Sequence, residues 1–245
     1  MFWRKKNKKV KQKDELNPDY IELINYYKWL IKETDIVEFG KQETNIELSK
    51  EFKQAFSKLS KLIQSARILN LKINNDEYKL FGWTNKNNIR CGWINKFENN
   101  VDSKLNLIDE HKLLLNSIGG IWESFNQPEP SLTLNQEFLF IESECLSGIG
   151  GWDEYYEVSL EQGEFEPIDY KDFICFAREA NGDVTLYNPT NKKVFLFAHD
   201  HCFDNVEFLL NQPEYTFHKI NGVINFKDYV EKLASEWINH IIMNE

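Results

Sequence analysis

The stretch that decides the fold is "DFICFAREANGDVTLYNPTNKKVFLFAHDH", residues 172–201. It contains three short apolar runs, separated by the turn-forming groups "ANGD" and "NPTNKK". Asn-Gly pairs favour the positive φ angles of a tight hairpin, so Asn181 and Gly182 predict a turn between the first two runs. Because both connections are short, we expect three consecutive antiparallel strands, a meander, with no parallel crossover.

Helical patterns lie on both sides of this meander. Apolar residues at helical spacing predict four helices, over residues 17–33, 49–69, 103–116 and 225–242. The first pattern begins with Asn17 as an N-cap and Pro18 at the first helical position. Gly119 can end the third helix in the left-handed conformation.

Further strands are expected outside the meander. "YKLFGWT" (78–84) and "IRCGWIN" (89–95), joined by "NKNN", are typical of a hairpin, and short strands are predicted over 137–142 and 215–220. The last of these would form an edge strand before a turn at Asn221 and Gly222. Helices at both ends of an antiparallel sheet predict an α+β fold, with a central three-strand meander flanked by N-terminal helices and a C-terminal helix.

The charge is unevenly distributed along the 245 residues. The formal net charge is −10, but residues 1–13 hold seven of the 29 basic residues and no acid, which leaves 22 basic against 39 acidic residues, or −17, in the rest. So acidic a body disfavours nucleic acid and attracts a basic partner. Residues 1–13 are expected to be a disordered basic tail, with transient contact to an anionic surface as the alternative.

Composition also indicates where the chain functions. There is no run of about 18 apolar residues, and no apolar segment follows the basic start, so we expect neither a membrane span nor a secretory signal. The four cysteines are scattered and form no CxxC pair. Reduced thiols in the cytoplasm are the expectation.

Four segments form an ordered set along the chain: "HKLLLNSIGGIWESF" (111–125), "ICFAREANGDVTLYN" (174–188), "KVFLFAHDH" (193–201) and "INFKDYVEKLASEWI" (224–238). Taken in this order, they resemble the SUKH superfamily. That family includes regulators of fungal cell-wall assembly and many bacterial immunity proteins. The resemblance covers roughly 105–240. It implies a single α+β domain that binds other proteins, and no catalytic residues carry over.

The same resemblance suggests how the chain is organised. We expect a basic tail over residues 1–13, a helical and hairpin extension over 14–104, and a SUKH-like core over 105–245. The extension is expected to pack on the core as one compact unit.

The run "FLFAHDHCFDNV" (195–206) places residue types that bind metals or take part in catalysis side by side. Along a strand, His199 and His201 share one face, while Asp200 and Cys202 fall on the other. Two histidines at this spacing can chelate zinc, but a stable site needs further ligands, and no ordered metal motif completes it. A strand-end hydrogen-bond network is favoured, a partner contact is the next alternative, and we predict no metal site.

Two glycine-rich stretches combine turns with aromatic and acidic residues. "SIGGIWE" (117–123) and "SGIGGWDEYYE" (147–157) lack every phosphate-loop motif, so they predict tight turns or a partner surface. Acids steer a basic partner, and aromatic residues anchor interfaces. The predicted partner-binding residues are Trp122, Glu123, Trp152, Asp153, Glu154, Tyr155, His199 and His201.

These observations favour a non-enzymatic, protein-binding domain without a cofactor. The resemblance makes an immunity protein the leading hypothesis, one that covers a basic toxin domain such as a nuclease. The alternatives are a metal-dependent hydrolase built on His199 and His201, and a regulatory scaffold that binds a host protein.

Overall fold

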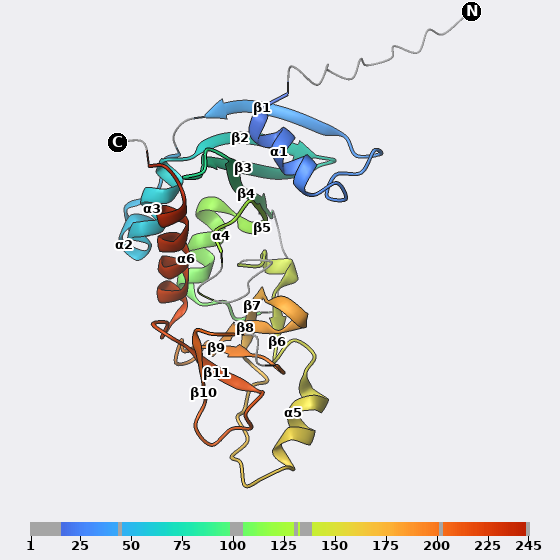
Figure 1. Cartoon of the computed structure of the whole chain (residues 1–245), viewed down its shortest axis with the longest axis vertical. Coiled ribbons are helices and arrows are strands. Elements are labelled where there is room, and N and C mark those ends of the chain that lie inside the picture. Colours follow the sequence, from blue (N-terminus) through green and yellow to red (C-terminus); the bar gives the residue numbers. More distant parts are fainter. Residues whose placement is uncertain are drawn as a thin grey trace, which may run out of the picture.

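The computed structural model describes residues 16–43, 46–98, 105–129, 132, 139–200 and 203–243. Two antiparallel sheets lie at opposite ends of an elongated molecule, with helices packed between them (Figure 1). The predicted α+β class and antiparallel pairing are confirmed. The strands divide between two sheets instead of forming one. The basic tail over 1–13 lies outside the described residues.

The first sheet has five strands in the order β1-β2-β3-β4-β5. Their bounds are Val37–Glu43, Arg67–Ile73, Asp76–Thr84, Arg90–Phe97 and Gly120–Phe125. The predicted hairpin is confirmed as β3 and β4, with Trp83 opposite Cys91 in the register. Pairing of β5 with β4 joins residues on both sides of position 104, where we expect the extension to meet the core.

The second sheet has the order β10-β11-β9-β8-β7-β6. The bounds, in chain order from β6 to β11, are Leu146–Ser147, Ile174–Arg178, Val184–Tyr187, Val194–Phe197, Val206–Phe208 and Phe217–Ile220. The predicted meander is therefore confirmed as β7, β8 and β9. Its first turn, the 3-10 segment η3 (Ala180–Gly182), has φ values of 61° at Asn181 and 81° at Gly182.

Two strand predictions need correction. β11 was expected at the sheet edge, but it lies between β9 and β10, because Val206–Phe208 adds a further strand outside it. The expected strand over 137–142 does not form in its described part, 139–142, where the 3-10 segment η2 (Glu142–Glu144) begins. Residues 137 and 138 lie outside the described residues.

Helix ends follow local capping where the sequence supplies it. The helices α1 to α6 span Pro18–Tyr26, Lys50–Ala55, Ser57–Gln64, Asp109–Ile118, Asp153–Leu160 and Phe226–His240. Asn17 caps α1, and Gly119, with φ of 73°, ends α4 as predicted. The expected helix over 49–69 is instead broken at Phe56, and the chain has already entered β2 at Arg67.

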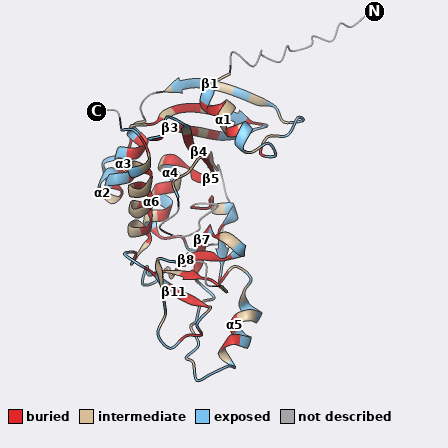
Figure 2. Cartoon of the chain, in the orientation of Figure 1, coloured by how far each residue is buried: buried red, intermediate tan, exposed pale blue. Residues whose placement is uncertain are grey.

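Helix α6 lies between the two sheets, beside α3 and α4 (Figure 1). Its Trp237 is fully buried and contacts Trp83 and Trp93 of the first sheet, with ring centroids 5.5 and 5.1 Å away. Its Tyr229 meets Phe176 of β7 edge-on at 5.0 Å. Buried residues of both sheets and of α6 therefore belong to one continuous hydrophobic core, and Figure 2 shows where the buried residues lie.

Backbone pairing fixes both ends of α6. Before the helix, the Val194 amide of β9 donates to the Ile224 carbonyl at 3.0 Å, and Asn225 caps the first turn in a reciprocal capping box with Asp228. After it, the Ile242 amide donates to the Thr84 carbonyl of β3 at 2.8 Å. The helix is thus connected at its start to the second sheet and at its end to the first.

A smaller cluster covers the outer face of the first sheet. Tyr20 and Leu23 of α1 pack there on the strands. The buried carboxylate of Asp19 accepts hydrogen bonds from Arg67 and Arg90 at 2.7–2.9 Å, which ties α1 to β2 and β4. Among the described residues, no helix combines the length and apolar character needed to cross a membrane.

The first prediction concerns the indole that joins the sheets. Replacing Trp237 by Ala removes a fully buried ring, so the free energy of unfolding should fall by about 3–5 kcal/mol in a urea titration. Trp29→Ala is the matched control, because Trp29 is 63% exposed, and it should change stability by less than about 0.5 kcal/mol. Equal effects of the two variants would contradict the proposed role of α6.

The second prediction follows from a buried histidine. His111 of α4 is fully buried and lies 3.2 Å from the Tyr187 hydroxyl, and burial lowers its pKa to about 3. Below the unfolded value of about 6.5, the unfolded chain binds a proton that the folded chain does not. Stability should therefore fall by about 1.4 kcal/mol per pH unit between about 6 and 3 from this group alone.

A His111→Gln variant isolates this effect. The variant should have a lower free energy of unfolding than the unmodified chain at pH 7.5. The difference between the two free energies should become smaller with each pH unit below 6.5. Urea titrations at several pH values measure this difference. Parallel stability curves for the two chains would show that His111 does not titrate as its burial requires.

Candidate functional site

The loop after β9 meets the turn before β8. His199 lies two residues beyond Phe197, the end of β9. Its amide donates to Asp183 Oδ1 at 3.2 Å, and its Nδ1 lies 2.7 Å from the same oxygen. Asp183 directly follows the Asn181-Gly182 turn, so the turn places a carboxylate beside the imidazole ring.

Three aromatic side chains pack together where this loop meets the start of α5, and are here called the Trp152 cluster: Trp152, Tyr155 and His199. The Trp152 ring stacks on the His199 ring with centroids 4.3 Å apart and planes 22° from parallel. Trp152 Nε1 donates to the Gly182 carbonyl at 3.0 Å. Tyr155 meets both other rings edge-on, at 5.8 and 6.2 Å. All three side chains are only partly buried, so the group forms part of the surface.

Helix α5 carries this cluster and is anchored by Tyr156. The Tyr156 ring is 1% exposed and packs edge-on against Phe217 at 5.3 Å. Its hydroxyl donates to Gln212 Oε1 at 2.6 Å and accepts from the Ile168 amide at 3.0 Å. The anchor leaves the first turn facing outward, where Asp153 and Glu154 are exposed and favoured by the helix dipole.

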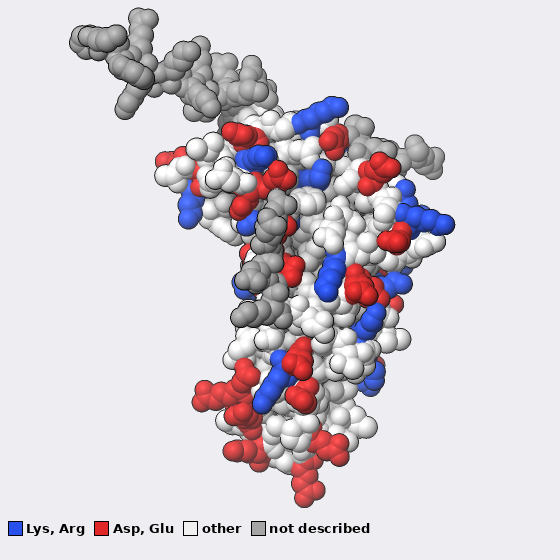
Figure 3. Space-filling view, turned by 180° about the vertical axis from the view of Figure 1, so that it is seen from behind, with Lys and Arg blue, Asp and Glu red and all other residues white. Residues whose placement is uncertain are grey.

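Acidic residues continue along the chain from this helix. Residues 153–172, here called the acidic segment, contain eight acids and one lysine, and all nine side chains are exposed. Figure 3 shows acidic side chains gathered at the end of the molecule where α5 lies. The Trp152 cluster therefore adjoins a strongly negative surface.

Burial affects the carboxyl group beneath the cluster. Asp183 is fully buried, and desolvation raises its pKa, while hydrogen bonds from His199 act in the opposite direction. Its second oxygen, Oδ2, has no hydrogen-bond partner in the described part of the chain. Asp200, the next residue after His199, accepts a hydrogen bond from Asn181 Nδ2 at 2.6 Å.

The structure brings together five of the eight predicted site residues. Trp152, Asp153, Glu154, Tyr155 and His199 lie on α5 and the neighbouring loops. His201 lies outside the described residues, as does Cys202. The two remaining residues, Trp122 and Glu123, lie on β5 of the first sheet.

Trp122 and Glu123 do not join the Trp152 cluster. Trp122 packs beside Tyr78 in the outer cluster of the first sheet, with ring centroids 5.2 Å apart. Glu123 is 6% exposed and cannot offer its charge to a partner without rearrangement. Sequence reasoning treated the two glycine-rich stretches alike, but they lead into different sheets.

Sequence reasoning missed Asp183. The signal was present, because Asp183 closes the predicted "ANGD" turn. In the register of the meander, Val184 pairs with Phe197, so Asp183 must lie near the residues that follow β9. That register had to be known before the two segments could be connected.

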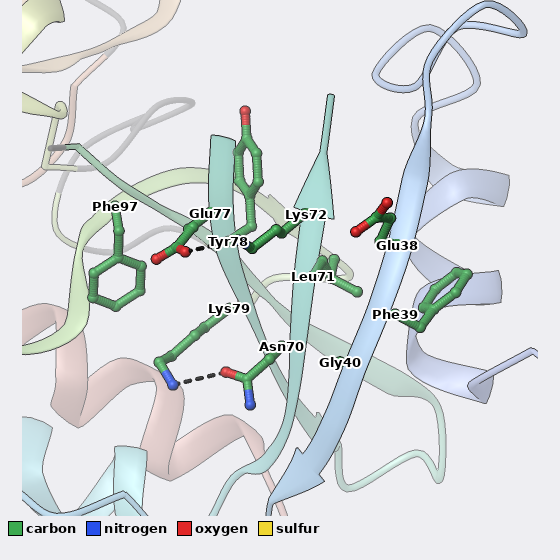
Figure 4. A pocket seen from close by; sticks show the side chains of 10 residues that line it. All are labelled: Glu38, Phe39, Gly40, Asn70, Leu71, Lys72, Glu77, Tyr78, Lys79 and Phe97. Atoms are coloured by element: carbon green, nitrogen blue, oxygen red, sulfur yellow. Dashed lines mark hydrogen bonds and ion pairs between the residues drawn. The ribbon is translucent and has the colours of Figure 1, made fainter. Parts of the chain in front are cut away.

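Two open hollows lie elsewhere on the surface. One, of about 380 Å³, crosses β1, β2 and β3 (Figure 4). Both of its lysines have polar partners: Lys79 donates to Asn70 at 2.7 Å, and Lys72 lies 3.1 Å from Glu77. The other, of about 710 Å³, lies beside β9 and β11 and is lined by two lysines, two acids and three asparagines as well as apolar residues. Neither contains the Trp152 cluster.

Comparisons with protein-family models, curated proteins and solved structures give no match for this chain. The function is therefore argued from the geometry of the Trp152 cluster and its charges.

A third prediction tests the pair beneath the cluster. His199→Ala leaves the buried Asp183 carboxylate without its imidazole partner, and should lower the free energy of unfolding by about 1–3 kcal/mol. Adding Asp183→Asn should recover part of this loss, because the buried group is then neutral. Urea titrations of the two single variants and the double variant measure the coupling energy.

His240→Ala is the control, since the His240 ring is also partly buried but lies against the Asn126 carbonyl, the Asn85 amide and the Trp237 ring, with no carboxylate among these contacts. Strict additivity of His199→Ala and Asp183→Asn would contradict a direct interaction in solution.

Proposed function

We propose that this chain is a non-enzymatic, protein-binding domain that presents the Trp152 cluster and the acidic segment to a basic protein. The observation that carries the proposal is a partly exposed indole held in place on two sides and bordered by exposed acids. The His199 ring lies against one face of Trp152, and the Gly182 carbonyl fixes its edge.

Preorganisation makes this arrangement suited to binding. Tryptophan and tyrosine are frequent anchors of protein interfaces, and an anchor that is already ordered loses little conformational entropy on association. The surrounding acids would accelerate encounter with a basic partner and disfavour acidic ones. The same negative surface disfavours nucleic acid as a ligand.

The described thiols support a role without nucleophilic catalysis. Cys91, Cys145 and Cys175 are buried, and desolvation raises the pKa of each thiol, to about 12 for Cys91 and Cys175. A thiol with so high a pKa stays protonated at neutral pH and is a poor nucleophile.

The resemblance to the SUKH superfamily supports a more specific proposal. The four segments that carry it contribute α4 with its Gly119 end, the β7–β8 hairpin, β9 and α6, in the order of the resemblance. Immunity members of that family block toxins by direct contact. We therefore propose that the partner is a toxin domain with a basic active-site cleft, as nucleases have, and that the acidic surface covers it.

The fourth prediction is tested against any toxin domain that is encoded beside this gene. The purified chain should bind one of them and inhibit its activity, with an affinity that falls as salt increases. Trp152→Ala should weaken binding about 30-fold or more, as loss of an interface anchor does. A double reversal, Asp153→Lys with Glu154→Lys, should slow association. Calorimetry and stopped-flow kinetics measure the two effects.

The matched control reverses two exposed acids at the other end of the molecule, Glu33→Lys with Glu47→Lys. It changes the net charge equally and should affect binding much less. If the neighbouring toxins neither bind nor lose activity, the immunity proposal fails. If binding occurs but both double variants weaken it equally, the Trp152 cluster is not the contact surface.

A further inference from the structure

Three potential metal ligands converge beneath the Trp152 cluster. One side-chain donor atom from each of Asp183, His199 and Asp200 lies within 4.8 Å of the other two. The residues come from two segments, the turn before β8 and the loop after β9, so folding and not sequence adjacency brings them together. Two carboxylates and one imidazole are donors that first-row transition-metal ions accept.

The second observation is the state of Asp183. Its side chain is fully buried, and Oδ2 has no hydrogen-bond partner in the described part of the chain. Burying a carboxylate oxygen without a partner costs about 1–3 kcal/mol or more. The structure otherwise satisfies the same group well, since Oδ1 interacts with both the amide and the ring of His199. A bound cation would give this unpartnered oxygen, or the carboxylate as a whole, the interaction that it lacks.

We propose that Asp183, His199 and Asp200 bind one divalent transition-metal ion, with Zn²⁺ the preferred occupant. The inference goes beyond the proposed partner binding and does not depend on it. Imidazole favours Zn²⁺ over Mg²⁺ and Ca²⁺, which prefer sites made only of oxygen atoms.

The local geometry needs little change to admit a metal ion. His199 Nδ1 and Asp183 Oδ1 already lie 2.7 Å apart. Two ligands bound about 2.0–2.1 Å from one tetrahedral ion lie about 3.3 Å apart, so the pair needs to open by about 0.6 Å. Asp200 is partly exposed and can move toward the ion.

Neighbouring groups already orient two of the ligands. Trp152 stacks on the His199 ring and limits its rotation. Asn181 Nδ2 holds the Asp200 carboxylate through Oδ2. Outer contacts of this kind commonly change metal affinity about 10–100-fold. With three protein ligands, the remaining coordination positions would be filled by water.

The fifth prediction is measured by calorimetry on the full chain after treatment with a chelator. Zn²⁺ should bind with a stoichiometry of one, and Mg²⁺ should bind at least about ten-fold more weakly. His199→Gln and Asp200→Asn should each weaken Zn²⁺ binding by at least about ten-fold. Both positions are partly exposed, so neither change is expected to unfold the chain, and thermal unfolding without metal verifies this.

His240→Gln is the matched control, because His240 is a partly buried histidine outside the three-residue group. The affinity of this variant for Zn²⁺ should stay within about two-fold of that of the unmodified chain. Co²⁺ gives a second readout, because it should quench the fluorescence of Trp152, and Trp152→Phe should abolish that quenching. Absence of Zn²⁺ binding, or binding that persists in both His199→Gln and Asp200→Asn, would overturn the proposal.

Discussion

The packing of α6 between the two sheets is the constraint on which the rest of the structure depends. Each sheet leaves an apolar face that another layer must cover, and this helix helps to cover both. Its Trp237 contacts the first sheet, its Tyr229 contacts the second, and backbone bonds connect its ends to β9 and β3. A helix of 15 residues is about 22 Å long, so its length sets how far apart the sheets lie.

The candidate site depends on that packing through a chain of contacts. One face of the second sheet is covered by the central core, and α5 packs on the other through Tyr156. With the sheet held, the register of β8 and β9 places the turn at Asn181 beside the loop at His199. The Trp152 cluster is therefore positioned by two strands of the meander. The sheet, and not the contacts among the partly exposed rings, holds these residues in place.

The sequence allowed the local features to be predicted. Asn17, Gly119 and the Asn181-Gly182 turn each act within a few residues of their own position, through a side-chain cap or a positive φ angle. Features that depend on distant partners were predicted less well. The helix break at Phe56 and the position of β11 inside its sheet are set by packing between segments far apart in the chain.

The same distinction applies to the site. Trp152, Asp153, Glu154 and Tyr155 are consecutive, so their proximity could be predicted, and His199 was identified as part of a strand-end network. Trp122 was grouped with them by composition alone, yet it lies on a different sheet. Asp183 was missed because its role arises only from the pairing of β8 with β9. Register is a tertiary property, and local sequence patterns leave it undetermined.

The two proposed ligands would influence each other, because His199 belongs to both sites. A dication on His199 adds two positive charges within a few ångströms of Trp152, whose ring lies 4.3 Å from the imidazole. At 10 Å in water, each charge of a basic partner would be repelled by about 0.8 kcal/mol, and by about a third of that at physiological salt. Several such charges in a basic cleft would add together. Ordering of Trp152 by the ion offers little compensation, since the stack and the Gly182 hydrogen bond already order it. The coupling is therefore unfavourable, and by linkage a bound basic protein would weaken the metal site to the same extent.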